Sequence, residues 1–206
     1  MADFYLASHS ARRRELLRQI GARFETLLLR IAAPRGPDVG EEMHAGELPA
    51  DYARRIAQEK AEHGAGTVIA RSMLVRPVLA ADTVVSIDGQ VLGKPRDAAE
   101  AAQFLRQLSG RTHEVRTAIS LALPGGGKHA VWSAESVTLV SMRSISEEEI
   151  ARYCASGEPF DKAGGYAIQG RAAIFIGRIE GSYSGVVGLP LAETADILAR
   201  AGVRLL

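Results

Sequence analysis

A near-continuous apolar run, Val78–Val85, constrains the fold more than any other stretch of the sequence. Such a run is typical of a β-strand covered on both faces, and the turn signal Asp88–Gly89 predicts a hairpin with Val91 and Leu92. Asp82 interrupts the run, and burying a carboxylate is costly unless a cation, a metal or a hydrogen-bond donor accompanies it. Asp82 is therefore either a strand-end residue that bonds the backbone, or a metal ligand or general base.

The remaining elements follow from periodicity and from end signals. Apolar runs predict further strands at Phe4–Ala7, 113–123, 131–142 and Ala172–Ile179. Apolar residues at helical spacing predict five helices. The first is capped by Ser8 or Ser10 and stops at Gly21, and the second starts near Pro49. The third starts at Asp97 and closes at Gly110, the fourth runs from Ser146 through Tyr153, and the fifth covers 191–199. The pattern is that of a mixed α/β enzyme-like domain.

Bulk composition excludes several classes of function. The chain has 206 residues, of which 47% are hydrophobic, and this length fits one large domain or two closely joined lobes. A formal net charge of +1 argues against a nucleic-acid binder. Cys154 is the only cysteine, and the chain shows neither a secretory signal nor an apolar run long enough to cross a bilayer. We expect a cytoplasmic protein without a disulfide, a membrane span or a histidine-built zinc centre.

The segment Glu158–Gly170 is built unlike an ordinary connector. It contains two acids, a lysine, a glutamine and three glycines, and it reads as a loop. Glycines let backbone amides approach a ligand closely, and an adjacent Asp and Lys can hold a metal and a phosphate oxygen. A second glycine- and serine-rich loop, Gly181–Pro190, precedes the last helix. We expect both loops to serve one site that binds an anion.

Cationic and amide side chains supply further candidates, each with an ordinary alternative. Arg12 and Arg13 stand at a helix start, where they can hold phosphate oxygens or form a solvated face. Lys60 continues the apolar row of Tyr52 and Ile56, which points it toward the interior. Lys60, Lys94 and Lys162 are each either a phosphate contact or a solvent-exposed lysine. Gln169 can read the donor and acceptor groups of a pyrimidine edge, or simply bond backbone and water.

Taken together, these blocks resemble the Maf family, and they occur in the family's order: Leu6–Leu17, Ala81–Val85, Gly93–Pro95, Leu108–Thr117, Glu158–Gly170 and Gly188–Pro190. The resemblance covers nearly the whole chain. It implies an elongated mixed sheet flanked by helices, a single domain over 1–206 with two lobes and a central cleft, as in inosine triphosphatases. Maf proteins are nucleoside triphosphate pyrophosphatases, originally linked to inhibition of septum formation, and homodimers are common among them.

The variant with Asp-Lys-Ala-Gly and Ile-Gln-Gly resembles the branch acting on dTTP and UTP, which implies a nucleotide diphosphatase with a house-cleaning role, also toward modified pyrimidine triphosphates. By this resemblance, Asp82 matches the catalytic acid, and Arg12, Thr83 and Gln169 match positions that tune substrate choice. The expected phosphate contacts are Ser8, Arg13, Lys60, Lys94 and Lys162. A divalent cation, Mg²⁺ or Mn²⁺, is expected on Asp82, Glu158 and Asp161.

The chain also departs from the family pattern. The usual Ser-Pro before the arginines is Ser10–Ala11 here, preceded by His9, and this makes the first loop less rigid. The acidic pair that often follows the second strand is absent where Ile31–Ala33 stands. Glu41 or Glu42 must then substitute as a metal ligand, or metal binding is weaker. This loss favours an alternative, a non-catalytic nucleotide-binding regulator of septum formation and cell division.

Overall fold

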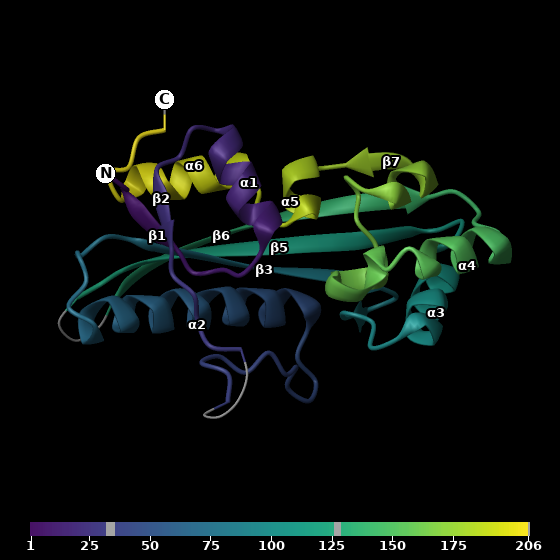
Figure 1. Cartoon of the computed structure of the whole chain (residues 1–206), viewed down its shortest axis with the longest axis horizontal. Coiled ribbons are helices and arrows are strands. Elements are labelled where there is room, and N and C mark those ends of the chain that lie inside the picture. Colours follow the sequence, from purple (N-terminus) through teal and green to yellow (C-terminus); the bar gives the residue numbers. More distant parts are fainter. Residues whose placement is uncertain (32–35, 126–128, 206) are drawn as a thin grey trace. The chain divides into compact units, whose positions relative to one another are not determined.

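The computed structural model describes residues 1–31, 36–125 and 129–205, and these form a mixed α/β protein with a seven-stranded sheet flanked by helices (Figure 1). The hydrogen-bonded strand order is β2-β1-β3-β5-β6-β7, with β4 paired to β3 alone. The strands are β1 (Phe4–Leu6), β2 (Phe24–Thr26), β3 (Val78–Ile87), β4 (Gln90–Leu92), β5 (Thr112–Leu123), β6 (Ala130–Met142) and β7 (Ile176–Glu180). The helices are α1 (Ala11–Gln19), α2 (Pro49–Ala70), α3 (Ala98–Leu108), α4 (Glu147–Ala155), α5 (Tyr183–Val187) and α6 (Leu191–Arg200).

The chain divides into two compact units. The first comprises Met1–Asp82, Thr117–Glu135 and Gly188–Leu206, and the second comprises Thr83–Arg116 and Ser136–Val187. Strands β3, β5 and β6 contribute residues to both units. The two lobes and the central cleft expected from the resemblance stay predictions.

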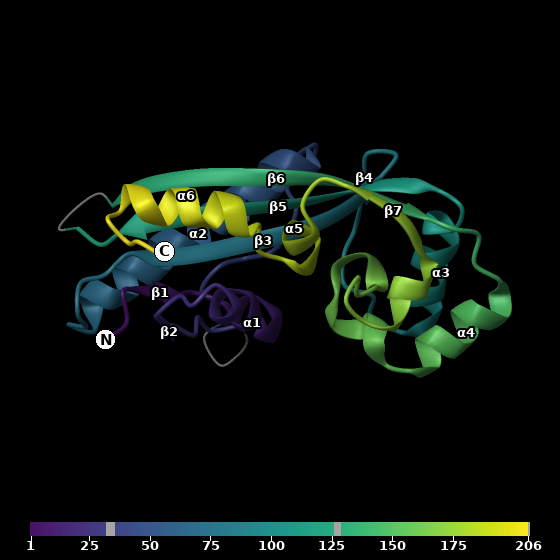
Figure 2. The same ribbon diagram turned by 90° about the horizontal axis from the view of Figure 1, so that it is seen from above.

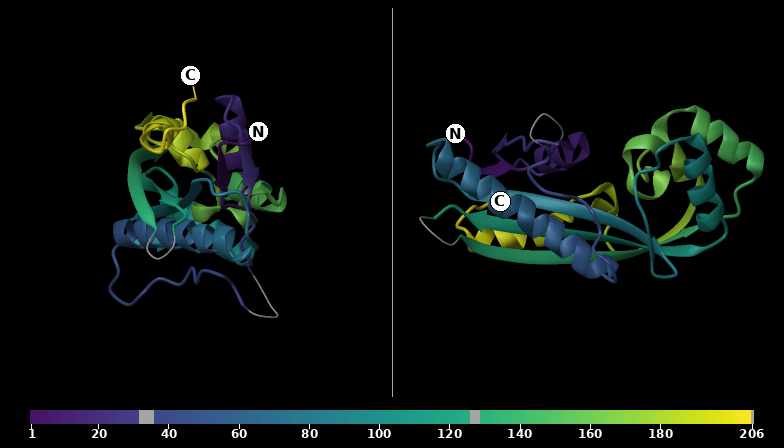
Figure 3. Two further views of the ribbon diagram at one scale, coloured as in Figure 1. Left: turned by 90° about the vertical axis from the view of Figure 1, so that its left-hand side faces the viewer. Right: turned by 90° about the horizontal axis from the view of Figure 1, so that it is seen from below.

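In the first unit, α2 and α6 lie on opposite sides of the strands (Figures 1 and 3). Strand β1 pairs in parallel with both β2 and β3, and its side chains Phe4, Tyr5 and Leu6 are fully buried or nearly so. Helix α2 packs closely on β3, because a Cβ at Gly64 would lie 2.7 Å from Val78 Cγ1. The buried first half of β3 is thus covered as its apolar composition predicts.

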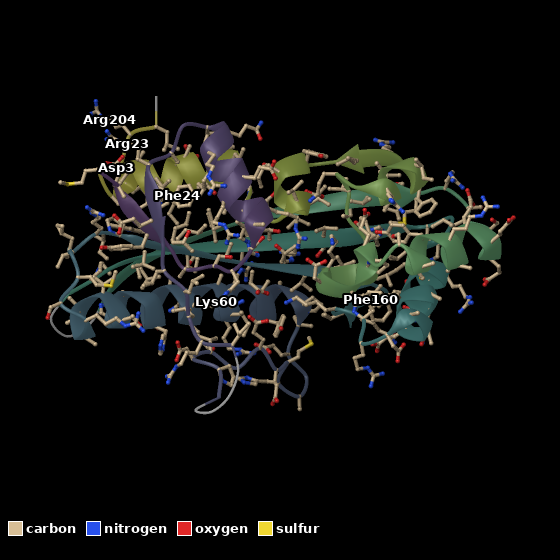
Figure 4. All side chains as sticks on the ribbon, in the orientation of Figure 1. Asp3, Arg23, Phe24, Lys60, Phe160 and Arg204 are labelled. Carbon is tan, nitrogen blue, oxygen red and sulfur yellow. The ribbon has the colours of Figure 1, made fainter. Side chains whose placement is uncertain are left out.

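Strand β2 is a short element that the sequence pattern did not reveal. Its three residues are too few to display a period of two. It is held against β1 by a bidentate pair between Arg23 and Asp3, at 2.9 and 3.0 Å, and by stacking of Phe24 on Phe4 with centroids 6.0 Å apart (Figure 4).

In the second unit, α3, α4 and a glycine-rich segment gather on one side of the strands, as seen from above and below (Figures 2 and 3). The predicted helix starts are confirmed. Asp97 Oδ1 accepts the N–H of Glu100 at 2.8 Å, and Ser146 forms a reciprocal capping box with Glu149. Apolar faces of both helices pack into one core with Leu105, Leu108 and Ile150 fully buried or nearly so.

Both predicted hairpins are formed. Asp88 and Gly89 have φ of 52° and 76°, the pair of positive values that a tight two-residue turn requires, and Val85 pairs with Leu92 across it. Strands β5 and β6 are neighbours joined by residues 124–129, a connection too short for a crossover, so the two run antiparallel. The glycine tip of that connection, residues 126–128, lies outside the described residues.

Two predictions in the last third of the chain are wrong. The strand expected at Ala172–Ile179 begins only at Ile176, because residues Arg171–Phe175 form a 3-10 helix, η3. The expected loop Gly181–Pro190 contains the short helix α5, whose first turn is stabilised by Ser182 Oγ accepting the N–H of Gly185 at 3.0 Å.

None of the helices in the described part of the chain is long and apolar enough to cross a membrane. The longest, α2, carries charged residues along its length.

Gly164 and Gly157 form a matched test of packing in the second unit. Both have a positive φ, 70° and 75°, but a Cβ at Gly164 would lie 2.8 Å from Val85 Cγ1, whereas a Cβ at Gly157 meets nothing within 4 Å. We expect Gly157→Ala to lower the free energy of unfolding by about 1 kcal/mol through backbone strain alone. Gly164→Ala should cost a further ~1 to 3 kcal/mol through overpacking. Urea unfolding measures both, and equal losses would contradict this account.

Candidate active site

Asp82 lies at the centre of a charged cluster in the first unit. Its Oδ1 accepts a hydrogen bond from Lys60 Nζ at 2.9 Å, and the two side chains are only 13% and 14% exposed. Burial raises the pKa of Asp82, while the positive charges of Lys60 and Arg13 oppose this shift. The expectation that a cation accompanies the buried carboxylate is confirmed.

The position of Lys60 follows from the periodicity of α2. Ile56, one turn earlier, is fully buried, and Lys60 continues the same helical face toward β3 (Figure 4). Its long side chain is covered along its stem while its ammonium reaches the carboxylate. The prediction that Lys60 points inward is therefore confirmed, and a solvated surface lysine is excluded.

Arg13 reaches the same cluster from α1. Its Nε donates to the carbonyl of Gly188 at 2.7 Å and its Nη1 to Ser8 Oγ at 3.3 Å. Burial lowers the pKa of Arg13, the Asp82 carboxylate raises it, and Arg12 lowers it. A guanidinium stays protonated in proteins, so Arg13 is a fixed, partly buried cation.

The two serines before α1 have different roles. Ser10 is the N-cap, because its Oγ accepts the N–H of Arg13 at 3.3 Å. Ser8 is 7% exposed and its Oγ accepts both the N–H of Ser10 at 3.2 Å and the Arg13 guanidinium. The open choice of cap is thus decided for Ser10, which leaves Ser8 beside Arg13.

Glu41, one of the two acids expected to substitute for the missing acidic pair, joins this cluster. Its Oε1 lies 2.6 Å from Lys60 Nζ, and its charge contributes to raising the pKa of Asp82. The only sequence signal was an acidic loop ahead of α2. Glu42 shows no such role, since it is its backbone carbonyl that accepts from Arg55. Of the segment where the acidic pair was expected, residues 32 and 33 lie outside the described residues.

The Glu41 segment is fastened to α2. Tyr52 Oη donates to the carbonyl of Glu41 at 3.0 Å, and Arg55 binds the Glu47 carboxylate with two contacts of 2.7 and 2.8 Å. Burial first, then the negative charges of Asp82 and Glu41, raises the pKa of Tyr52 to about 12, so its hydroxyl remains a donor. These contacts hold the Glu41 carboxylate near Lys60.

The acids of the glycine-rich segment are in the second unit and have partners of their own. Glu158 accepts from the hydroxyl of Tyr153 at 2.9 Å and from the N–H of Arg171 at 3.1 Å. Lys162 donates to the carbonyl of Glu158 at 2.7 Å and pairs with the Asp161 carboxylate. Two short 3-10 helices, η1 (Glu158–Asp161) and η2 (Ala163–Gly165), occupy this predicted loop.

Three further sequence candidates, Lys94, Thr83 and Gln169, also lie in the second unit, whereas Arg12 lies in the first. Lys94 is exposed just after β4, in a turn whose Gly93 carbonyl accepts the N–H of Gly164 at 3.0 Å. Thr83 directly follows Asp82 on β3 and is half-buried, and Gln169 is exposed. The structure therefore brings together Asp82, Lys60, Arg13, Ser8 and Glu41 in one unit. The roles expected for the second-unit residues stay predictions.

A divalent cation fits one pair of carboxylates. Among the described residues, no group of three or more His, Cys, Asp or Glu side chains could hold a metal ion. Asp82 and Glu41, however, both contact the same Lys60 ammonium, so two carboxylates converge on one positive charge. Mg²⁺ commonly binds through one or two carboxylates together with substrate phosphates, and this pair suits that requirement.

A buried polar pair anchors the glycine-rich segment to β5. The His113 ring lies 2.7 Å, Nε2 to Oη, from Tyr166, and the two rings meet edge to face. His113 is 2% exposed, and its Nδ1 has no hydrogen-bond partner in the part of the chain that the structure describes. Burial lowers the pKa of His113 to about 4, so the ring is neutral at pH 7.

Fold and site define a mixed α/β protein whose apolar central strand carries an acid enclosed by cations. The Maf-like protein family matches residues 3–201, and the chain belongs to this family. A protein of Nitrosomonas europaea named dTTP/UTP pyrophosphatase is 52% identical over 97% of this chain and 94% of its own length. Proteins with the same name from Bordetella parapertussis and Dechloromonas aromatica are 51% and 46% identical, over 97% of this chain and 92% and 98% of their own lengths.

His113 should make the folded state sensitive to acid. Its pKa is lowered from the ordinary 6.5 to about 4, so the unfolded chain binds its proton first and stability falls as pH drops through that window. We expect the wild-type protein to lose about 2 kcal/mol more than His113→Gln between pH 7 and pH 5. Urea unfolding at the two pH values measures this. His44→Gln, at an exposed loop position, is the control and should behave like wild type.

Proposed function

We propose that this protein is a nucleoside triphosphate pyrophosphatase that hydrolyses dTTP and UTP to the monophosphate and pyrophosphate. The observation that carries the proposal is the buried Asp82 carboxylate enclosed by Lys60 and Arg13. A raised carboxyl pKa suits a general base, and fixed cations beside it suit a polyphosphate. The relatives named dTTP/UTP pyrophosphatase, alike over nearly the whole chain, support the same reaction and the pyrimidine preference.

The proposed reaction is attack of water on the α phosphorus. The water oxygen bonds to that phosphorus, one proton passes to the Asp82 carboxylate, and the bond to the oxygen that bridges to the β phosphorus breaks. Pyrophosphate leaves with that oxygen. Lys60 holds Asp82 in place and, with Arg13, offsets the negative charge that develops on the leaving group. Ser8 keeps the Arg13 guanidinium oriented.

Asp82 and Glu41 would hold a divalent cation, Mg²⁺ or Mn²⁺, together with the phosphates. When bound, the cation neutralises phosphate charge. Glu41 would thus take the place of the acidic pair that the family pattern puts near Ile31–Ala33. In this proposal, the missing acidic pair no longer favours a non-catalytic regulator of cell division.

The second-unit residues and Arg12 complete the proposal. We assign substrate choice to Arg12, Thr83 and Gln169, and further phosphate contacts to Lys94 and Lys162. Gln169 is exposed and presents both a donor and an acceptor, as recognition of a pyrimidine edge requires. We further propose that the protein is cytoplasmic. The family resemblance also supports a homodimer, which we include in the proposal.

Asp82→Asn tests the chemistry. Wild-type protein with Mg²⁺ or Mn²⁺ should convert UTP and dTTP to monophosphate and pyrophosphate, identified by chromatographic product analysis. Asp82→Asn keeps the shape but cannot take the proton, so we expect a loss of about 10² to 10⁴-fold in kcat. Circular dichroism should show that the fold is retained.

Asp88→Asn is the matched control, because Asp88 lies on the exposed turn that ends the same strand. It should retain full activity. Release of a single phosphate, binding without turnover, or an active Asp82→Asn protein would each contradict the proposal.

Gln169→Ala tests base selection. A site that hydrogen-bonds the correct base leaves its own polar groups unpaired when the wrong base binds. Removing the Gln169 amide should therefore reduce the preference for UTP over GTP by roughly 10-fold, the effect of losing about one hydrogen bond. The ratio of the two kcat/KM values measures the change. Gln103→Ala, an exposed glutamine on α3, should leave the ratio unaltered, and an unaltered ratio in Gln169→Ala would remove this role.

A further inference from the structure

The side chain of Glu158 is committed to the protein itself. Its Oε1 accepts from the Tyr153 hydroxyl at 2.9 Å and from the N–H of Ala172 at 3.4 Å, and its Oε2 accepts from the N–H of Arg171 at 3.1 Å. Both carboxylate oxygens therefore bind donors on elements far along the chain. Hydrogen bonds to an ionised acceptor are about twice as strong as neutral ones, so this carboxylate fixes the start of η3.

Tyr153 links the Glu158 carboxylate to the backbone on the N-terminal side of Gln169. Its hydroxyl donates to Glu158 and accepts the N–H of Ala167 at 3.3 Å, using donor and acceptor capacity together. Burial, followed by the bond to Glu158, raises the pKa of Tyr153, so the proton stays on the oxygen. The ring is held edge-on to Phe175 at 5.6 Å. The hydroxyl is thus a fixed point on α4.

Gln169 stands between these anchored amides. Ala167 precedes it by two residues, and Arg171 and Ala172 follow it by two and three. The N–H of Gly170 bonds the carbonyl of Ala167 at 3.0 Å, which closes a turn around the glutamine. A Cβ at Gly170 would lie 2.6 Å from Glu158 Cδ, so the carboxylate presses on the backbone next to Gln169. The backbone is held on both sides while the Gln169 side chain remains exposed.

We propose that Tyr153 and Glu158 form a clamp that positions Gln169 for base recognition, and that Glu158 acts through this clamp and not as a metal ligand. The inference rests on the proposed role of Gln169. A hydrogen-bonding side chain discriminates between bases only if its own direction is fixed before the substrate arrives, and this clamp supplies that constraint. Both clamp members are positioning residues.

The test uses Tyr153→Phe, which removes only the hydroxyl, and Glu158→Gln, which places an amide donor where a backbone N–H needs an acceptor. Glu148→Gln is the control, because Glu148 is exposed on the same helix and pairs only with the surface residue Arg152 among the contacts found in the described chain. Amide hydrogen exchange of Ala167, Arg171 and Ala172 is measured in the free protein. The kcat/KM ratio for UTP over GTP is measured for each variant, alone and combined with Gln169→Ala.

We expect Tyr153→Phe to speed exchange at Ala167, Glu158→Gln to speed exchange at Arg171 and Ala172, and both to reduce the UTP preference several-fold. Neither should reduce it further in the Gln169→Ala background, because the clamp acts through that side chain. The control should change nothing. Tyr153→Phe keeps the test decisive if Glu158→Gln fails to fold.

The outcomes that overturn the inference are distinct from those that overturn the proposed function. If Gln169→Ala relaxes selectivity but the clamp variants leave the ratio unchanged, the clamp is wrong and the function stands. If Glu158→Gln instead raises the Mg²⁺ concentration needed for activity at an unchanged ratio, Glu158 is a metal ligand and the clamp is wrong. If Gln169→Ala leaves the ratio unchanged, the base-reading role falls, and the clamp loses its functional meaning with it.

Discussion

An ionisable carboxylate inside an apolar strand can persist only if cations surround it, and this constraint organises the first unit. Lys60 on α2 donates to Asp82, the positive charge of Arg13 on α1 acts on the same carboxylate, and both cations are partly buried. Removing one member would leave a buried charge uncompensated, which typically costs about 3 to 5 kcal/mol. Helices α1 and α2 therefore place cations beside Asp82, and the Glu41 segment, fastened by Tyr52 and Arg55, joins the same balance of charges.

In the second unit, side-chain hydrogen bonds hold the irregular segment Glu158–Gly170 in one conformation. The glycine-rich segment is fixed by its own Glu158 carboxylate and by two side chains outside it, the hydroxyl of Tyr153 and the ring of the buried His113. Glu158 and Asp82 are both partly buried acids, yet one binds backbone N–H groups and the other faces side-chain cations. The two acids therefore have different partners: backbone N–H groups hold Glu158 within its segment, whereas side-chain cations offset the charge of Asp82.

Much of the fold was predictable because its signals are local. A Ser146 and Glu149 capping box, an Asp88–Gly89 turn and a Val78–Val85 run each act within a few residues, and each is present where expected. The failures lie where distant groups intervene. Residues Arg171–Phe175 leave the strand pattern because their first N–H groups bond Glu158, thirteen residues earlier, and helix α5 forms within a loop-like composition because Ser182 caps it.

The sequence by itself determined the residue types that the site needs: an acid in a buried strand, a lysine on an apolar helical row, arginines at a helix start, and glycines in a polar segment. Periodicity alone predicted that Lys60 points inward, because α2 presents one face to β3 and Lys60 lies on that face. Only the tertiary structure decided that Ser10 and not Ser8 caps α1, that Glu41 and not Glu42 reaches Lys60, and that Glu158 serves the backbone. Those choices depend on distances between segments remote in sequence, which no local pattern encodes.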